Sequence, residues 1–188
     1  CDRSALRPFI GLGSRALITL SYEASNIVLS ERRLDAVQKH FLELYAEDIA
    51  QKSLPYPGVI DTLTLLKRGG ASLSVCTNKP GYLARPLMDA LDMTHFFDRI
   101  IGSDDTAQKK PAAGHIFHAV GHRGTRPIIM VGDSAPDVNA AKAAKAASVI
   151  VSYGYSPAPV ETLGADIILR NFREIPSAIK TLAGRISA

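Results

Sequence analysis

The feature that most constrains this chain is a short apolar run that leads into two carboxylates. Ile128 to Val131 is apolar, Gly132 follows, and Asp133 and Asp137 lie on the next turn. Because a continuous apolar run of this length is typical of a buried strand in a parallel sheet, we expect a strand here. Ligands of open α/β sheets bind outside the carboxyl ends of such strands. Two carboxylates at this point suit Mg²⁺, although the same residues would also serve as simple caps of the following helix.

From about Pro55 onward, strand-like and helix-like segments alternate along the chain. Apolar runs predict strands over 71–76, 99–101, 127–131, 149–151 and 167–169. Helical periodicity predicts helices over 59–67, 82–91, 112–120, 136–147 and 174–182. Such alternation indicates an α/β fold, a Rossmann-like parallel sheet with helices on both faces.

The first 52 residues have a different pattern and are predicted to be helical throughout. Ser30 is a plausible N-cap, and Glu31 is well placed in the first turn of the helix that follows. The apolar residues of this helix recur at three- and four-residue steps and form one stripe, namely Leu34, Val37, Phe41, Leu44, Tyr45 and Ile49. The segment 55–58 then interrupts the helix. We therefore expect an all-helical domain over residues 1–52 and an α/β core over residues 53–188.

Composition and charge exclude several classes of protein. The chain has 188 residues and a formal net charge of +4, and its basic residues are scattered without interleaved aromatic residues. This pattern does not indicate a nucleic-acid groove, and no apolar run is long enough to span a membrane. With Cys1 and Cys76 as the two cysteines there is no disulfide framework, which favours the cytoplasm. The sequence does not indicate an oligomeric state.

Two further segments carry polar groups that suit a phosphate. Thr77 and Asn78 follow a predicted strand and precede a helix, so a hydroxyl and an amide lie beside free backbone N–H groups. Lys109 and Lys110 precede Pro111, and a lysine ammonium neutralises phosphate as a point charge. The simpler alternatives are that Thr77 or Asn78 caps a helix and that the two lysines are solvated.

Taken in order, these three segments resemble motifs two, three and four of the haloacid-dehalogenase superfamily of phosphotransferases, and within it the phosphoglycolate-phosphatase-like branch. The resemblance covers nearly the whole chain. Its most specific segments are Val75 to Pro80, Lys109 to Pro111, and Val131 to Asp137, and the segment Ser152 to Ser156 also looks like this branch.

The resemblance implies a role for each matching residue. Asp133 would bind Mg²⁺ directly, and Asp137 would hold a metal-bound water or orient the site. Thr77 would donate a hydrogen bond to the transferring phosphoryl group with Asn78 beside it, and Lys110 would neutralise the charge of phosphate and nucleophile. The helical domain over 1–52 would be a cap that closes over the site and selects a small phosphorylated metabolite.

One departure from the family bears on catalysis. The family's first motif is an Asp-x-Asp at the end of the first core strand, and it supplies the nucleophile that forms an aspartyl-phosphate. This sequence contains no Asp-x-Asp, since Asp104 and Asp105 are adjacent. We therefore expect a core without its first strand and a nucleophile that lies upstream of residue 1. The alternatives are a non-catalytic relative that only binds, and a sugar-phosphate mutase, which usually carries Glu-Asp-Ser where Gly132 to Ser134 stand here.

Two smaller features complete the expectations. Lys145 stands where the branch usually has a glycine that ends a helix, which leaves the local turn in doubt. His115, His118 and His122 recur at helical spacing and would suit zinc, but no nearby cysteine or carboxylate completes such a site. The alternative for the histidines is a solvated or half-buried stripe.

Overall fold

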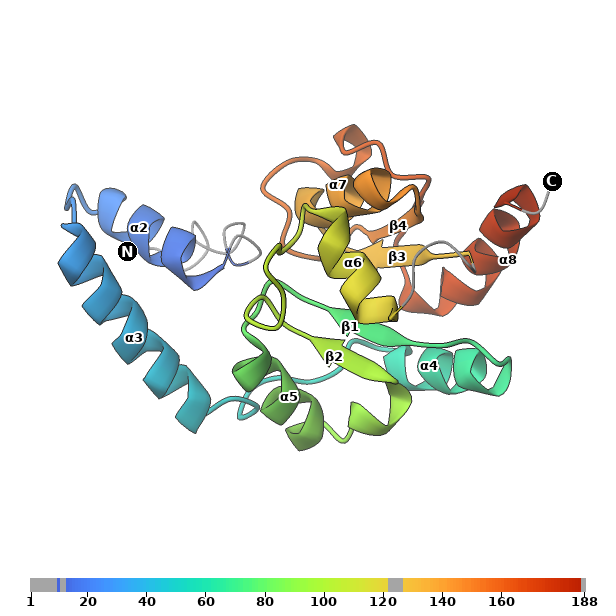
Figure 1. Cartoon of the computed structure of the whole chain (residues 1–188), viewed down its shortest axis with the longest axis horizontal. Coiled ribbons are helices and arrows are strands. Elements are labelled where there is room, and N and C mark those ends of the chain that lie inside the picture. The colour runs from blue at the N-terminus through green and yellow to red at the C-terminus, as the bar shows by residue number, and fades with distance from the viewer. Residues whose placement is uncertain (1–9, 11–12, 122–126, 187–188) are drawn as a thin grey trace.

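The computed structural model describes residues 10, 13–121 and 127–186, and it consists of a two-helix hairpin beside an α/β body (Figure 1). The hairpin contains α2 (Ser14–Glu23) and α3 (Glu31–Glu47), with Ser30 at the N-cap position of α3 as predicted. Ile18 of α2 and Leu34 of α3 are its buried apolar residues. Within the described part of residues 1–52, the helical prediction therefore holds for these two helices but not for the turns over 24–30 and 48–52, and residues 1–9 and 11–12 lie outside the described residues.

Arg15 of α2 fastens the hairpin to the start of α3. Its guanidinium donates to Asp35 Oδ1 at 2.6 Å and to Gln38 Oε1 at 3.2 Å, and it also pairs with Glu31. The rest of α3 has fewer partners, since Phe41 and Leu44 of the predicted stripe are exposed. The hairpin is thus held mainly at one end.

The α/β body alternates helices and strands much as predicted. In chain order its elements are α4 (Val59–Arg68), β1 (Ser74–Cys76), α5 (Gly81–Ala90), β2 (Arg99–Ile101), α6 (Ala113–Val120), β3 (Ile129–Gly132), α7 (Ala135–Ala144), β4 (Ala147–Val151), β5 (Ile167–Leu169) and α8 (Ile175–Ile186). Short 3₁₀ turns lie at Thr94–Phe96, Val160–Thr162 and Phe172–Glu174. No helix within the described ranges is long and apolar enough to cross a membrane.

The strands are parallel, but they form two sheets where the sequence predicted one. β1 pairs with β2, and β3, β4 and β5 pair in that order. Among the described strands, none pairs with both β1 and β3, so each of these two has an edge without a partner strand. β1 and β3 are half-buried along their whole length, whereas β4 is almost entirely buried.

Helices cover both faces of the strands, as the alternating pattern predicts. Val149 of β4 belongs to a buried cluster with residues of α8, whereas its neighbour Ile150 packs with Val138 of α7. Because successive strand residues point to opposite faces, this alternation places α7 and α8 on opposite sides of β4. α6 lies beside α7 and contacts β1 and β2.

The end of α7 resolves the doubt about Lys145. This residue adopts the left-handed conformation, with φ of 54° and ψ of 36°, and the next N–H, that of Ala146, bonds to the carbonyl of Ala141 at 2.9 Å. Such a six-to-one bond closes a Schellman turn, in which a glycine is usual. The helix predicted to reach residue 147 therefore ends at Ala144, and β4 begins at once.

Replacing Lys145 by glycine should stabilise the protein by about 1 kcal/mol, because a left-handed conformation strains residues that carry a Cβ. Lys180→Gly is the matched control. That lysine is exposed inside α8, where glycine should lower the free energy of unfolding by about 1 kcal/mol. Urea denaturation of both variants measures the two shifts, and a shift of the same sign in both would contradict the explanation.

Candidate functional site

The candidate site is organised around Lys110, whose side chain is only 9% exposed. Its ammonium donates to the carbonyl of Cys76 at the end of β1 and to Oδ1 of Asp137 at the start of α7, both at 2.6 Å. A buried charge is costly unless it is paired and hydrogen-bonded, and here it is both. The lysine is therefore an ordered part of the site and not the solvated surface residue of the simpler alternative.

Asp137 is both a helix cap and the partner of Lys110. Its Oδ2 accepts hydrogen bonds from the N–H of Asp133 at 3.1 Å and from the N–H and hydroxyl of Ser134 at 3.1 and 3.0 Å. With Ser134 it forms a capping box at the start of α7. A carboxylate has about four lone-pair sites, and these three donors and Lys110 make four contacts. Three of these contacts are to Oδ2, whereas Oδ1 accepts only Lys110 and so keeps one lone-pair site.

Asp133 has a different environment, although it lies on the same turn. Its Oδ2 accepts the backbone N–H of Tyr155 at 2.7 Å, on the loop after β4. That loop can approach because residue 154 is glycine, where a Cβ would lie 2.2 Å from Cβ of Asp133. Among the described residues, no hydrogen-bond partner is found for Oδ1, so this oxygen is available for a ligand.

Thr77 and Asn78 of the second predicted segment bond to two different backbone carbonyls. The N–H of Thr77 donates to the carbonyl of Ile101 at 3.0 Å, and the side-chain amide of Asn78 donates to the carbonyl of Lys110 at 3.1 Å. Neither side chain caps α5, whose N-cap residue is Pro80. The capping alternative is therefore not what the structure shows for these two residues. Oδ1 of Asn78 is buried and has no partner among the described residues.

The histidine stripe divides into two different environments. His115 is fully buried in α6, whereas His118 is exposed and His122 lies outside the described residues. Within the ranges that are described, no group of three or more His, Cys, Asp or Glu side chains is placed to hold a metal ion. The ring of His115 and the backbone N–H of Tyr155 are the groups that reasoning from the sequence missed. A backbone donor leaves no signal in the sequence. The glycine before Tyr155 could nevertheless have indicated that this loop approaches another part of the chain closely.

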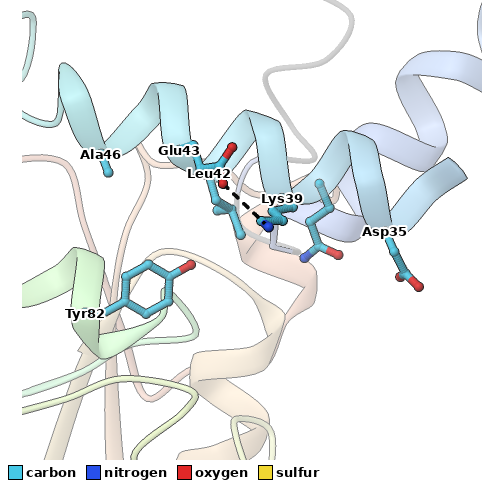
Figure 2. A pocket seen from close by; sticks show the side chains of 7 residues that line it. Asp35, Lys39, Leu42, Glu43, Ala46 and Tyr82 are labelled. Carbon is cyan, nitrogen blue, oxygen red and sulfur yellow. Dashed lines mark ion pairs between the residues drawn. The ribbon is translucent and has the colours of Figure 1, made fainter. Parts of the chain in front are cut away.

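The hairpin meets the body near the candidate site. Lys79 donates to the hydroxyl of Tyr45 at 2.7 Å, and its ammonium lies 4.1 Å from the centre of that ring. Figure 2 shows the cleft of about 440 Å³ between α3 and Tyr82 of α5. A second cleft, of about 690 Å³, lies between α2 and Lys109. None of the five candidate residues is among the described residues that line either cleft.

The site as a whole defines a class of protein. A hydroxyl, an amide and a buried ammonium lie with two carboxylates at the carboxyl ends of parallel strands, where open α/β sheets bind their ligands. Donors and a cation of these kinds suit the oxygens of a phosphate group, and a free carboxylate oxygen suits a divalent cation. The fold is that of an α/β protein, and the groups at its strand ends are of kinds that suit a phosphate ligand.

Comparison with known proteins identifies the family. Residues 1–151 match the family described as Haloacid dehalogenase-like hydrolase. Phosphoglycolate phosphatases from Caulobacter vibrioides and Agrobacterium fabrum are 38% and 35% identical, over 94% and 93% of this chain and 76% of each relative. A crystal structure of a predicted phosphoglycolate phosphatase from Haemophilus somnus superposes with a TM-score of 0.84 at 27% identity, covering 95% of this chain and 83% of the other. The chain belongs to the haloacid dehalogenase-like hydrolase family, and within it to the phosphoglycolate-phosphatase-like enzymes.

Replacing Gly154 by alanine should destabilise the protein by about 1–3 kcal/mol, because the added methyl group would overlap Asp133 and force the loop or the carboxylate to move. The matched control is Gly184→Ala in α8, where a Cβ meets nothing within 4 Å. Alanine there should stabilise the helix by up to about 1 kcal/mol. Chemical denaturation distinguishes the two, and an unchanged stability of Gly154→Ala would contradict the close approach.

Proposed function

We propose that this chain carries most of the active site of a Mg²⁺-dependent phosphatase that hydrolyses a small organic phosphate monoester such as phosphoglycolate. The observation that carries the proposal is the buried Lys110, held between the end of β1 and the start of α7. A fixed cation between two strand ends is suited to a phosphoryl group that arrives at that edge. The phosphoglycolate phosphatases among the relatives support the same substrate class.

In this proposal, three side chains bind the phosphoryl group. The hydroxyl of Thr77 accepts the N–H of Lys79 at 3.1 Å, which leaves its own hydrogen free to donate to a phosphoryl oxygen. Asn78 lies beside it, and Lys110 neutralises negative charge on the phosphoryl group. Phosphoryl transfer depends mainly on positioning and on electrostatic stabilisation, and these residues would provide both.

The carboxylates would hold the metal ion. Mg²⁺ usually binds proteins through one or two carboxylates and keeps several waters and substrate oxygens as its other ligands. Asp133 fits this requirement because its Oδ1 has no partner among the described residues, and we assign it the direct contact. Asp137 would act on the same site by fixing Lys110 and by orienting metal-bound water. When bound, the ion would polarise the phosphoryl oxygens and neutralise charge.

The nucleophile in this proposal is an aspartate outside residues 1–188, on a strand that lies between β1 and β3. Both strands have edges without a partner strand in the described structure and are half-buried, as strands would be beside a missing neighbour. Cys76 is a poor alternative, because burial raises the pKa of its thiol to about 11 and keeps it protonated at neutral pH. The aspartate would form an aspartyl-phosphate that water then hydrolyses.

The helices over residues 1–52 would form a cap that excludes water and selects the substrate, with residues 53–188 as the catalytic core. The contact of Tyr45 with Lys79 supports this arrangement, because it joins α3 to the residue that follows Thr77 and Asn78. The cleft between α3 and Tyr82 leaves room for α3 to approach the core.

In the full-length protein, Lys110→Met and Asp133→Asn should each lower kcat/KM for phosphoglycolate by about 100-fold or more, the usual effect of removing one group that stabilises the transition state. Lys109→Met and Asp92→Asn are the matched controls, since both side chains are exposed, and they should retain near-normal activity. Phosphate release with Mg²⁺, and after its removal by EDTA, measures these effects. Full activity in EDTA would exclude the metal, and equal losses in variants and controls would exclude the assigned roles.

Residues 1–188 by themselves should not hydrolyse p-nitrophenyl phosphate in the presence of Mg²⁺, because the nucleophile is assigned to a strand outside them. Adding an N-terminal segment that ends in Asp-x-Asp should restore turnover. Turnover by residues 1–188 that Asp133→Asn abolishes would show that the attacking group is already present. A full-length protein that binds phosphate without hydrolysing any monoester would favour the non-catalytic alternative.

A further inference from the structure

His115 is a fully buried titratable residue to which the proposed chemistry assigns no role. It lies in the first turns of α6, the helix that follows Lys110, and its exposed fraction is 0%. Burying an imidazole without a hydrogen-bond partner is unfavourable, so the contacts of its two ring nitrogens indicate what the residue does.

One ring nitrogen faces the backbone of Lys110, and the other faces the end of β2. Nδ1 accepts the backbone N–H of Lys110 at 3.1 Å, and Nε2 lies 3.4 Å from the carbonyl oxygen of Ile101. An amide N–H can only donate, so Nδ1 carries no proton and the ring proton is on Nε2, directed at Ile101. The same carbonyl accepts the N–H of Thr77 at 3.0 Å.

We propose that His115 is a positioning residue: its neutral, Nε2-protonated ring ties the backbone of Lys110 to the carbonyl that orients Thr77. The ammonium of Lys110 and the hydroxyl of Thr77 come from different segments, and this ring fixes their separation. The inference rests on the proposed function, which assigns phosphate binding to these two side chains. His115 itself touches no substrate and acts through Lys110 and Thr77.

The surroundings of His115 favour the neutral ring that this role needs. The charged and titratable groups that face it are Lys110 in the preceding loop, His118 on its own helix and Asp105 in the loop after β2. Burial lowers the pKa of His115, and the charge of Lys110 acts in the same direction. The neutral ring therefore predominates above the ordinary histidine pKa of about 6.5. Its stabilising contribution decreases only as the pH falls below that value.

Three substitutions separate the two hydrogen bonds. His115→Asn places an amide oxygen where Nδ1 lies and so keeps the acceptor for Lys110. His115→Gln reaches the Nε2 position and keeps the donor to Ile101, and His115→Leu keeps neither. The control is His118→Asn, the same change on the exposed face of α6. All four are made in the full-length protein.

We expect kcat/KM to fall at least about tenfold in His115→Leu and His115→Gln, because both leave the buried N–H of Lys110 without an acceptor. In His115→Asn and in the control, kcat/KM should fall less than about threefold. Thermal midpoints should fall by similar amounts in the Asn and Gln variants, so a merely structural role would not separate their activities. Equal activities, or Gln above Asn, would overturn the proposal.

The tautomer provides a readout that does not depend on activity. In a long-range ¹H–¹⁵N spectrum of the ¹⁵N-labelled protein, the signals absent from His115→Asn belong to this ring. They should show a protonated Nε2 and an unprotonated Nδ1 at pH 7, with no titration near pH 6.5. A proton on Nδ1, or a charged ring at pH 7, would overturn the proposal. The expected tautomer in a protein without phosphatase activity would contradict the proposed function instead.

Discussion

The site depends on the two hydrogen bonds of the Lys110 ammonium, because they join two parts of the body that share no strand pairing. One of its hydrogen bonds goes to the last residue of β1, and the other goes to the first turn of the helix after β3. Removing one partner of a buried ion pair typically costs about 3–5 kcal/mol, because the remaining charge is left without compensation. Lys110 therefore fixes the distance between the end of β1 and the start of α7.

The two carboxylates of the Gly-Asp-Ser turn differ in what they can do because different numbers of donors surround them. Asp137 accepts from three groups of its own turn and from Lys110, so most of its hydrogen-bonding capacity is used within the protein. Asp133 accepts one backbone N–H from the loop after β4 and keeps an oxygen free. In the sequence, helix capping and phosphate chemistry were alternatives for this pair of carboxylates. In the structure, the single carboxylate of Asp137 both caps α7 and accepts a hydrogen bond from Lys110.

Periodicity and turn residues predicted most of the fold, because both are local properties. The strands 99–101 and 167–169 have the expected bounds, and Gly121 ends α6 in a left-handed turn. What could not be predicted depends on contacts distant in sequence. The ring of His115 is buried because β1 and β2 pack against α6. Spacing alone presented His115 and His118 as equivalent members of one stripe.

The segments that hold the site are linked through backbone groups more than through side chains. The carbonyl of Cys76 accepts Lys110, the carbonyl of Lys110 accepts Asn78, and the carbonyl of Ile101 accepts Thr77. A substitution at Cys76 or Ile101 leaves these carbonyls in place, so such positions can vary in sequence while the geometry persists. The side chains of Lys110, Asn78 and Asp137 cannot vary in this way, because each of them makes a bond that no backbone group replaces. A candidate site could therefore be predicted from a few polar residues, whereas the backbone groups that connect them could not.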